Sequence, residues 1–545
     1  MNPATPRNNS ADSIQKALLR GLMRPQSYPH AVGTIERIET HISIVLLTGR
    51  YAYKIKKPLS LGFLDFSTLA ARRHFCEEEL RLNRRLVPDL YLDVVAICGS
   101  PDAPYLASRD AGGALEYAVK MQQFPQRALL DRMLSSGELT GLQVNELAQI
   151  VAVFHAKVAR ATSEDPYGTP ASVAAPMRQN FTQMRAFLQA QGESQALDEL
   201  EQWSLAEHAA LAPLMEQRHR DGHVRECHGD LHLGNIACVD GQIRIFDCIE
   251  FNPGLRWTDV AAEIGFLVMD FSVRARPDLG ARFLNAYLEI TGDYAAVRLL
   301  PYYLVYRAMV RAKVACIHSH QTGITASQRE AANMEFAQHI RLARTFTRKP
   351  QPCLLITCGV AGSGKTTATQ ALVEQLGHLG ALRIRSDIER KRLHGLAGAA
   401  RSVSAVGAGL YSETATRGTY DELYRLAQLL IEAGWPVIVD ASFLLRSQRT
   451  RFRALAAAAG VPFLLLDCHA AAGELRRRVA QREAAGNDAS EATLAVLEHQ
   501  LDTVEPLAAD ERDSALSIDT QWGADQDIIE QVCVRLHLPP CAKPR

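Results

Sequence analysis

The stretch that decides the fold of the C-terminal half is CLLITCGVAGSGKTT, residues 353–367. An apolar run, typical of a buried strand, leads into Gly-x4-Gly-Lys-Thr, and a helical pattern follows. In such a loop the glycines let backbone N–H groups face phosphate oxygens at the positive end of the helix dipole. The sequence therefore predicts a P-loop, with Lys365 contacting the β- and γ-phosphates of ATP and Thr366 ligating Mg²⁺. The predicted cofactor-binding residues are Gly359, Gly362, Ser363, Gly364, Lys365, Thr366 and Thr367.

Strand candidates alternate with helical stretches through the rest of this half. The strand candidates are residues 354–357, 382–385, 437–439 and 463–466. That alternation predicts an α/β domain, a P-loop NTPase with a parallel sheet and helices on both faces.

Charged residues follow two of these strands. Asp387 can orient and deprotonate an acceptor hydroxyl, and Arg390, one turn later, can grip an anionic group of the acceptor. Asp440 ends an apolar strand as a Walker B carboxylate does, and it could serve either Mg²⁺ or the acceptor.

An arginine run at 476–482 precedes Gly486-Asn487-Asp488. Arg478 and Arg482 are one helical turn apart, which predicts a lid over the transferring phosphate. A solvated helix face is the alternative interpretation of this run.

The N-terminal half has its own informative stretch, HGDLHLGN at 228–235, with Asp247 twelve residues further on in an apolar run. Phosphoryl transfer needs a carboxylate to orient the attacking hydroxyl, and Asp230 fits that role. It also needs oxygen ligands for Mg²⁺, which Asn235 and Asp247 can supply, while His228 braces the loop.

This stretch resembles the aminoglycoside phosphotransferase family, whose motif reads His-Gly-Asp where protein kinases have His-Arg-Asp. The resemblance implies a two-lobed, α+β protein-kinase-like fold. It also implies that Lys54 holds the α- and β-phosphates, that one of Glu77, Glu78 or Glu79 is its helix partner, and that 116–121 is the hinge. The chain departs from the protein-kinase pattern because no Gly-x-Gly-x-x-Gly precedes Lys54. Lys56 and Lys57 compete with Lys54 for the phosphate role.

The C-terminal half resembles small P-loop kinases, particularly the kinase half of polynucleotide kinases and zeta-toxin-like kinases. In that family the Asp-x-x-Arg pair supplies the general base and an acceptor-binding arginine, which here are Asp387 and Arg390.

Length and composition set the frame for both halves. At 545 residues the chain exceeds a single core, and Lys+Arg and Asp+Glu both total 60. No apolar run suits a membrane span, and the 11 cysteines form no metal-binding or disulfide pattern, so we expect a cytoplasmic protein without a membrane partner. The predicted divisions are a polar tail at 1–27, a kinase domain at 28–346, a linker with prolines at 347–352 and a P-loop kinase domain at 353–545.

The main hypothesis is an ATP- and Mg²⁺-dependent phosphotransferase with two nucleotide sites and small hydroxyl-bearing acceptors. In one alternative the C-terminal half is a 5′-hydroxyl nucleotide or polynucleotide kinase, which the balanced charge does not favour. In another the N-terminal half is an ATP-binding regulatory pseudokinase. The sequence leaves the acceptors and the oligomeric state open.

Overall fold

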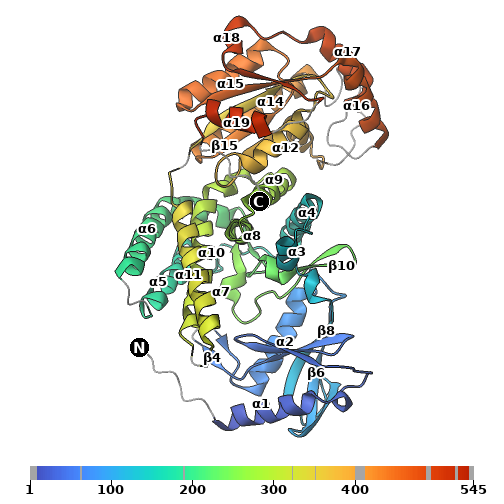
Figure 1. Ribbon diagram of the computed structural model, residues 1–545, viewed down its shortest axis with the longest axis vertical. Coiled ribbons are helices and arrows are strands. Elements are labelled where there is room, and N and C mark those ends of the chain that lie inside the picture. The colour runs from blue at the N-terminus through green and yellow to red at the C-terminus, as the bar shows by residue number, and fades with distance from the viewer. Residues whose placement is uncertain are drawn as a thin grey trace. The chain divides into compact units, whose positions relative to one another are not determined.

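The computed structural model describes residues 9–61, 64–187, 191–321, 323–349, 351–398, 412–485, 492–521 and 526–538. It separates into two compact units. The first contains Met1–Thr140, Phe154–Val173 and Ala212–Glu263, and the second contains Gly141–Val153, Ala174–Leu211 and Ile264–Arg545. The mixed α+β and α/β architecture predicted from the sequence is confirmed (Figure 1).

The first unit is built on an antiparallel six-stranded sheet in the order β1-β2-β3-β8-β6-β7. Residues 116–121, which the resemblance assigned to the hinge, instead lie in inner strand β8, paired on both sides. The first four residues of this strand are buried, with Tyr117 and Val119 in the core on one face and Ala118 on the other, so a hinge could begin only after it. The bounds of the sheet strands are β1 (Glu36–Glu39), β2 (Ser43–Leu47), β3 (Tyr51–Lys56), β6 (Tyr91–Ser100), β7 (Ala103–Ser108) and β8 (Glu116–Gln122).

The N-terminal segment differs from the loose polar tail that its composition predicts. Within it, helix α1 (Asn9–Leu22) forms, and Leu18, Leu19 and Leu22 are buried in the core of the sheet. Three leucines on one turn and a half of helix outweigh the polar residues around them, because only one helical face has to be apolar.

The remaining elements of the first unit carry the HGDLHLGN loop between short strands. Helix α2 (Leu69–Asn83) packs on strands β6 and β8. The other bounds are β4 (Ser60–Leu61), β5 (Leu64–Asp65), α3 (Leu130–Ser136), β9 (Val224–Glu226), β10 (Ile236–Val239), β11 (Gln242–Ile245), α7 (Pro253–Arg256) and β12 (Trp257–Asp259). Four helices contribute residues to both units: α4 (Gly141–Lys157), α5 (Pro170–Arg185), α6 (Gln191–Arg220) and α8 (Val260–Val273).

The second unit contains a five-stranded parallel sheet in the order β14-β15-β13-β16-β17. Helices α12 and α19 bury apolar side chains on one face of the sheet, and α14 and α15 pack on the other, as predicted. The strands are β13 (Cys353–Cys358), β14 (Leu382–Arg385), β15 (Pro436–Asp440), β16 (Phe463–His469) and β17 (Ala515–Asp519). The helices are α9 (Pro277–Thr291), α10 (Leu300–Ser319), α11 (Ala326–Phe346), α12 (Lys365–Gln375), α13 (Ser386–Leu393), α14 (Glu413–Glu432), α15 (Arg446–Ala459), α16 (Ala472–Ala485), α17 (Leu494–Thr503), α18 (Ala509–Arg512) and α19 (Gln526–Arg535).

Strand β13 is central and buried along its whole length, so the loop that follows it opens at the carboxyl edge of the sheet. Ligands bind at this edge in open α/β sheets. Among the described residues, no helix is both long and apolar enough to span a bilayer.

Candidate active sites

The predicted P-loop connects β13 to α12 as the sequence pattern requires. Gly359 has φ 142° and Gly364 has φ 79°, which is backbone that favours glycine. A Cβ at Gly359 would lie 2.3 Å from the carbonyl oxygen of Cys468, and one at Gly364 would lie 2.9 Å from Thr520. Both glycines are therefore needed for the loop to close against its neighbours.

Lys365 lies inside this loop. Its ammonium donates to the carbonyl oxygens of Gly359 and Val360, both at 2.8 Å. Burial lowers the pKa of Lys365, and the nearby Asp440 carboxylate opposes that shift. The lysine is thus held by neutral acceptors that phosphate oxygens can replace.

Thr366 and Asp440 form the next part of the site. The Thr366 hydroxyl donates to Oδ2 of Asp440 at 2.8 Å, and Asp440 is 5% exposed at the end of β15. A hydroxyl and a carboxylate are hard oxygen donors, and Mg²⁺ in phosphate sites takes few ligands from the protein. These two residues fit the ion that the sequence implies.

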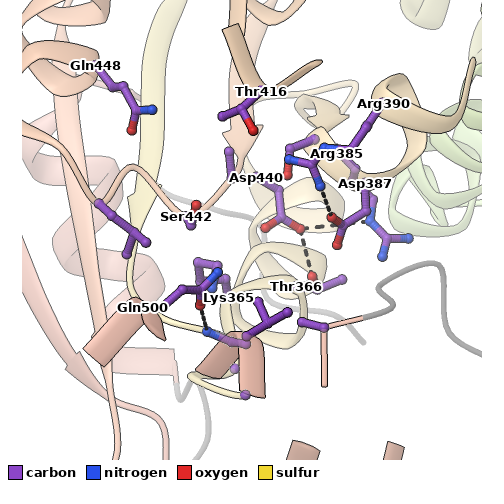
Figure 2. A pocket seen from close by; sticks show the side chains of 18 of the residues that line it. Lys365, Thr366, Arg385, Asp387, Arg390, Thr416, Asp440, Ser442, Gln448 and Gln500 are labelled. Carbon is purple, nitrogen blue, oxygen red and sulfur yellow. Dashed lines mark hydrogen bonds and ion pairs between the residues drawn. The ribbon is translucent and has the colours of Figure 1, made fainter. Parts of the chain in front are cut away.

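The acceptor side of the site faces this pair. Asp387 lies in the first turn of α13, where Nη1 of Arg390 donates to its Oδ1 at 3.1 Å. Both residues line a cavity of about 540 Å³ together with Lys365, Thr366 and Asp440, as Figure 2 shows. The residues predicted from separate motifs are therefore gathered around one volume.

The arginine run divides into two groups. Arg476 and Arg477 are about half exposed and pair with Glu498 and Glu474, so they match the solvated helix face. Arg478 also pairs with Glu474, at 2.6 Å, and in addition donates to the Thr520 carbonyl oxygen at 3.0 Å and to the Gly362 carbonyl oxygen at 3.3 Å. Arg482 donates to the Ala492 carbonyl oxygen at 3.2 Å. Arg478 and Arg482 line the cavity, whereas residues 486–488 lie outside the described residues.

Several cavity residues were missed from the sequence: Arg385, Thr416, Tyr420, Ser442, Gln448 and Gln500. Gln500, on α17, accepts from the backbone N–H of Ala361 at 2.7 Å, so it contacts the P-loop directly. Thr416, Tyr420, Gln448 and Gln500 carry no motif, because they lie on α14, α15 and α17, away from the predicted motifs. Arg385 and Ser442 did offer a signal, since each lies two residues from a predicted site residue, Asp387 or Asp440.

In the first unit, the structure distinguishes the three competing lysines. Lys54 forms a salt bridge with Glu79 at 2.9 Å and another with Asp247. Burial would lower the pKa of Lys54, but the charges of Asp247 and Glu79 hold that pKa well above its usual value. Lys56 pairs with Glu79 and Glu250, and Lys57 with Glu39. Glu79 is therefore the helix partner, and Lys54 is the lysine that it shares with Asp247.

The HGDLHLGN loop is held by buried hydrogen bonds. His228 Nε2 is 2.8 Å from the Phe246 carbonyl oxygen, and His228 Nδ1 accepts from the backbone N–H of Asp230 at 3.3 Å. His228 thus joins this loop to Phe246, the residue before Asp247, which supports the bracing role expected of it.

Asp230 and Asn235 meet on the exposed side of this loop. Nδ2 of Asn235 donates to the Asp230 backbone carbonyl oxygen at 3.0 Å and to its carboxylate at 3.2 Å. Asp230 keeps 37% of its side chain exposed, which leaves the carboxylate accessible to an acceptor. Asp247 adopts φ 68°, a left-handed conformation that is rare outside glycine and typical of functional sites. The Asn235 amide oxygen and the Asp247 carboxylate are donors that suit Mg²⁺.

Carboxylates near this loop serve as braces. Glu263 accepts the backbone N–H groups of His228 at 3.1 Å and Gly229 at 2.7 Å, and it pairs with His155 at 2.9 Å. Asp259 forms a bidentate pair with Arg218, at 2.8 and 2.9 Å. All of these groups are buried.

Comparisons with known proteins match both halves. Residues 76–300 match the family model described as "Phosphotransferase enzyme family", and residues 354–507 match the one described as "AAA domain". The chain is therefore similar to a phosphotransferase family in one part and to a P-loop, kinase-like domain in another. The two matches together support a phosphotransferase.

Relatives extend over most of the chain. Uncharacterised proteins of Mycobacterium tuberculosis and Mycobacterium bovis are 29% identical over 477 residues, which covers 86% of this chain and 92% of theirs. Among solved structures, an amicoumacin kinase is 14% identical with a TM-score of 0.38, covering 61% of this chain and 96% of that one. A sugar kinase from Janibacter is 21% identical with a TM-score of 0.27, covering 35% of this chain and 96% of its own.

Proposed function

We propose that the chain is a cytoplasmic, ATP- and Mg²⁺-dependent kinase whose P-loop site transfers the γ-phosphate to a hydroxyl group of a small acceptor. One observation carries the proposal: Lys365, the Thr366–Asp440 pair and the Asp387–Arg390 pair all line one cavity. A phosphate-binding lysine, a metal-ligand pair and a candidate base are the parts that phosphoryl transfer needs.

The step assigns a role to each group. Asp387 accepts the proton as the acceptor oxygen bonds to the γ-phosphorus, and the bond to the β-phosphate oxygen breaks to release ADP. Lys365, Arg478 and Arg482 stabilise the charge on the transferring group. Mg²⁺, held by Thr366 and Asp440, would neutralise the phosphates when bound. The hydrogen bond from Arg390 fixes the orientation of the Asp387 carboxylate.

The cavity lining favours a particular kind of acceptor. Thr416, Ser442 and Gln448 offer neutral hydrogen-bonding groups, and Arg390 offers a cation beside the candidate base. About 540 Å³ lies within the range of small-molecule sites. We infer a hydroxyl-rich acceptor that carries an anionic group.

We propose that the first unit holds a second nucleotide site. The Lys54–Glu79 and Lys54–Asp247 pairs support ATP binding there, and the exposed Asp230 supports transfer to a second small acceptor. The alternative function of this site is regulation by bound ATP without turnover. This alternative is supported by the lack of a Gly-x-Gly-x-x-Gly motif before Lys54.

The test is γ-phosphate transfer to a metabolite panel by the full-length chain and by Asp387→Asn and Asp230→Ala variants. Loss of a positioned base should reduce transfer about 10²–10⁴-fold at the affected site. The matched controls are Asp421→Asn and Asp89→Ala, both exposed residues whose loss should leave transfer unchanged. If neither Asp387→Asn nor Asp230→Ala lowers any transfer, the proposal is wrong.

The same panel separates the alternatives. A polynucleotide acceptor would bind with strong salt dependence, because each phosphate contact releases counterions. A regulatory first unit would lose no turnover in Asp230→Ala while ATP still raised its melting temperature.

A further inference from the structure

Helix α9 packs along the edge of the P-loop sheet, against strand β14. Both elements belong to the second compact unit, and β14 is the edge strand. An edge strand presents backbone groups that need partners. The Asn285 carboxamide supplies them: Nδ2 donates to the Ala381 carbonyl oxygen at 2.9 Å, and Oδ1 accepts from the Arg383 N–H at 2.7 Å. One buried side chain of α9 thus takes the place of a neighbouring strand.

Glu289, one turn further along α9, reaches the side chains of the same strand. Its Oε1 accepts from Nη2 of Arg383 at 3.0 Å, and its Oε2 lies 3.5 Å from Nη1 of Arg385. Arg383 and Arg385 are two residues apart, so both project from the same side of β14. The three side chains are 6–15% exposed, which shields these pairs from water.

Both arginines that pair with Glu289 also contact, or lie close to, residues of the P-loop site. Nη1 of Arg383 donates to the Thr366 carbonyl oxygen at 3.2 Å and to Oγ1 of Thr369 at 3.3 Å. Nε of Arg385 is 3.9 Å from Oδ2 of Asp440, the same oxygen that accepts the Thr366 hydroxyl. Figure 2 shows Arg385, Asp440 and Thr366 side by side.

We propose that Glu289 is a positioning residue of the P-loop site, which keeps the Asp440 carboxylate available to Mg²⁺. Arg385 lies between two carboxylates, at 3.5 Å from Glu289 and 3.9 Å from Asp440. The charge of Glu289 draws the guanidinium away from Asp440, and its bond to Arg383 anchors the first turn of α12. The inference rests on the proposed function, because it concerns the same metal-ligand pair.

Removing the Glu289 charge should move Arg385 towards Asp440, where the guanidinium competes with the cation for the carboxylate. Glu289→Gln should therefore raise the Mg²⁺ concentration that half-saturates the site about five- to tenfold, the range that one partly screened ion pair allows. ADP binding without Mg²⁺ should change less than about twofold, because Glu289 does not line the cavity.

The experiment uses the full-length chain and hydrogen exchange of peptides covering 359–375, measured at fixed ADP over a Mg²⁺ titration. This readout reports the P-loop site alone and does not depend on turnover. Glu374→Gln is the matched control, since Glu374 accepts from Arg282 of α9 at 2.8 Å without contacting Arg383 or Arg385. It should leave the Mg²⁺ midpoint unchanged.

Two further variants test the direction of the effect. Arg385→Gln removes the competitor, so its midpoint should equal or fall below that of the wild type. Glu289→Gln with Arg385→Gln should match Arg385→Gln alone, and this comparison holds even if Glu289→Gln by itself folds poorly. An unchanged midpoint in Glu289→Gln, with ADP protection intact in the wild type, overturns the inference alone. Absence of any ADP-dependent protection at 359–375 in the wild type overturns the proposed function as well.

Discussion

Glu263 allows the sharpest prediction about the first unit. The side chain is fully buried, and its carboxylate accepts two backbone N–H groups of the HGDLHLGN loop and pairs with His155. In Glu263→Gln an amide replaces the carboxylate, so one of the two oxygen positions becomes an NH₂ group. With the amide oxygen at the Oε2 position, the contacts to His228 and His155 persist in a weaker, neutral form. The N–H of Gly229 then loses its acceptor.

The cost follows from these bonds. A buried N–H without an acceptor costs about 1–3 kcal/mol, and each of the two remaining bonds loses about half of its strength. Together they give a destabilisation of about 3 kcal/mol, at the lower end of the range for breaking a buried ion pair. For a unit of about two hundred residues, this corresponds to a fall in melting temperature of about 6–12 °C.

The assay is thermal and urea unfolding of the full-length chain, with hydrogen exchange at 228–235 to assign the transition to the first unit. Glu77→Gln is the matched control: Glu77 is 39% exposed and pairs with Arg73, so its loss should cost less than about 0.5 kcal/mol. A loss of unfolding free energy below about 1 kcal/mol in Glu263→Gln would refute the bracing role of Glu263, because one unsatisfied buried N–H alone costs that much.

The pH dependence gives an independent check. Burial would raise the pKa of Glu263, but the hydrogen bond and charge of His155, the charge of His228 and the N–H of Gly229 lower it to about 2. Because the folded pKa lies below the unfolded value of 4.5, the carboxylate stabilises the fold above that value. The stabilisation disappears as pH falls towards 2. The difference in free energy of unfolding between wild type and Glu263→Gln should have its full value at pH 7 and shrink as the pH falls below about 4.5.

Two further predictions concern the two nucleotide sites. Gly359→Ala places a methyl group within 2.3 Å of a backbone oxygen in a left-handed conformation, so ADP should no longer protect residues 359–375 from hydrogen exchange; retained protection would contradict the assigned loop. Lys56→Met removes the lysine partner of the buried Glu250 carboxylate and leaves Glu79 with Lys54 alone, so it should destabilise the first unit by about 3–5 kcal/mol in urea unfolding. Lys57→Met, whose lysine is 20% exposed, should cost less than about 1 kcal/mol, and equal losses in the two variants would argue against the assignment.

The fold and the motif-borne part of the P-loop site could be predicted from the sequence because they depend on local backbone geometry. A strand, a Gly-x4-Gly-Lys-Thr loop and a helix need only neighbouring residues to form, and the structure confirms this order. The carboxyl ends of parallel strands meet at one edge of a sheet, and Asp387 and Asp440, which follow two such strands, both line the cavity.

The choice among the lysines and glutamates of the first unit could not be made in this way. Lys54 and Lys56 are two residues apart on one strand and so point to the same face, which alternation cannot separate. Glu77, Glu78 and Glu79 are consecutive on α2, and only their tertiary partners distinguish them. Glu77 and Glu78 pair with arginines of the same helix, whereas Glu79 turns to the sheet.

Contacts that join distant segments explain the largest gap between sequence and structure. The prolines at 347–352 predict a boundary between two domains along the chain, and that boundary stays a prediction. Side-chain contacts cross this boundary. Helix α9 lies before the prolines, within the 76–300 match, yet its Asn285 and Glu289 bond to residues 94–98 positions further along the chain. No periodicity within α9 distinguishes such residues from those of any amphipathic helix, because the signal lies in the partner strand. Asn285 bonds to the backbone of β14 on the side that is not paired with β15. We therefore expect a fragment cut at the linker to expose that edge and self-associate. The linker therefore marks a change of fold along the chain, and the P-loop sheet still depends on a helix that precedes it.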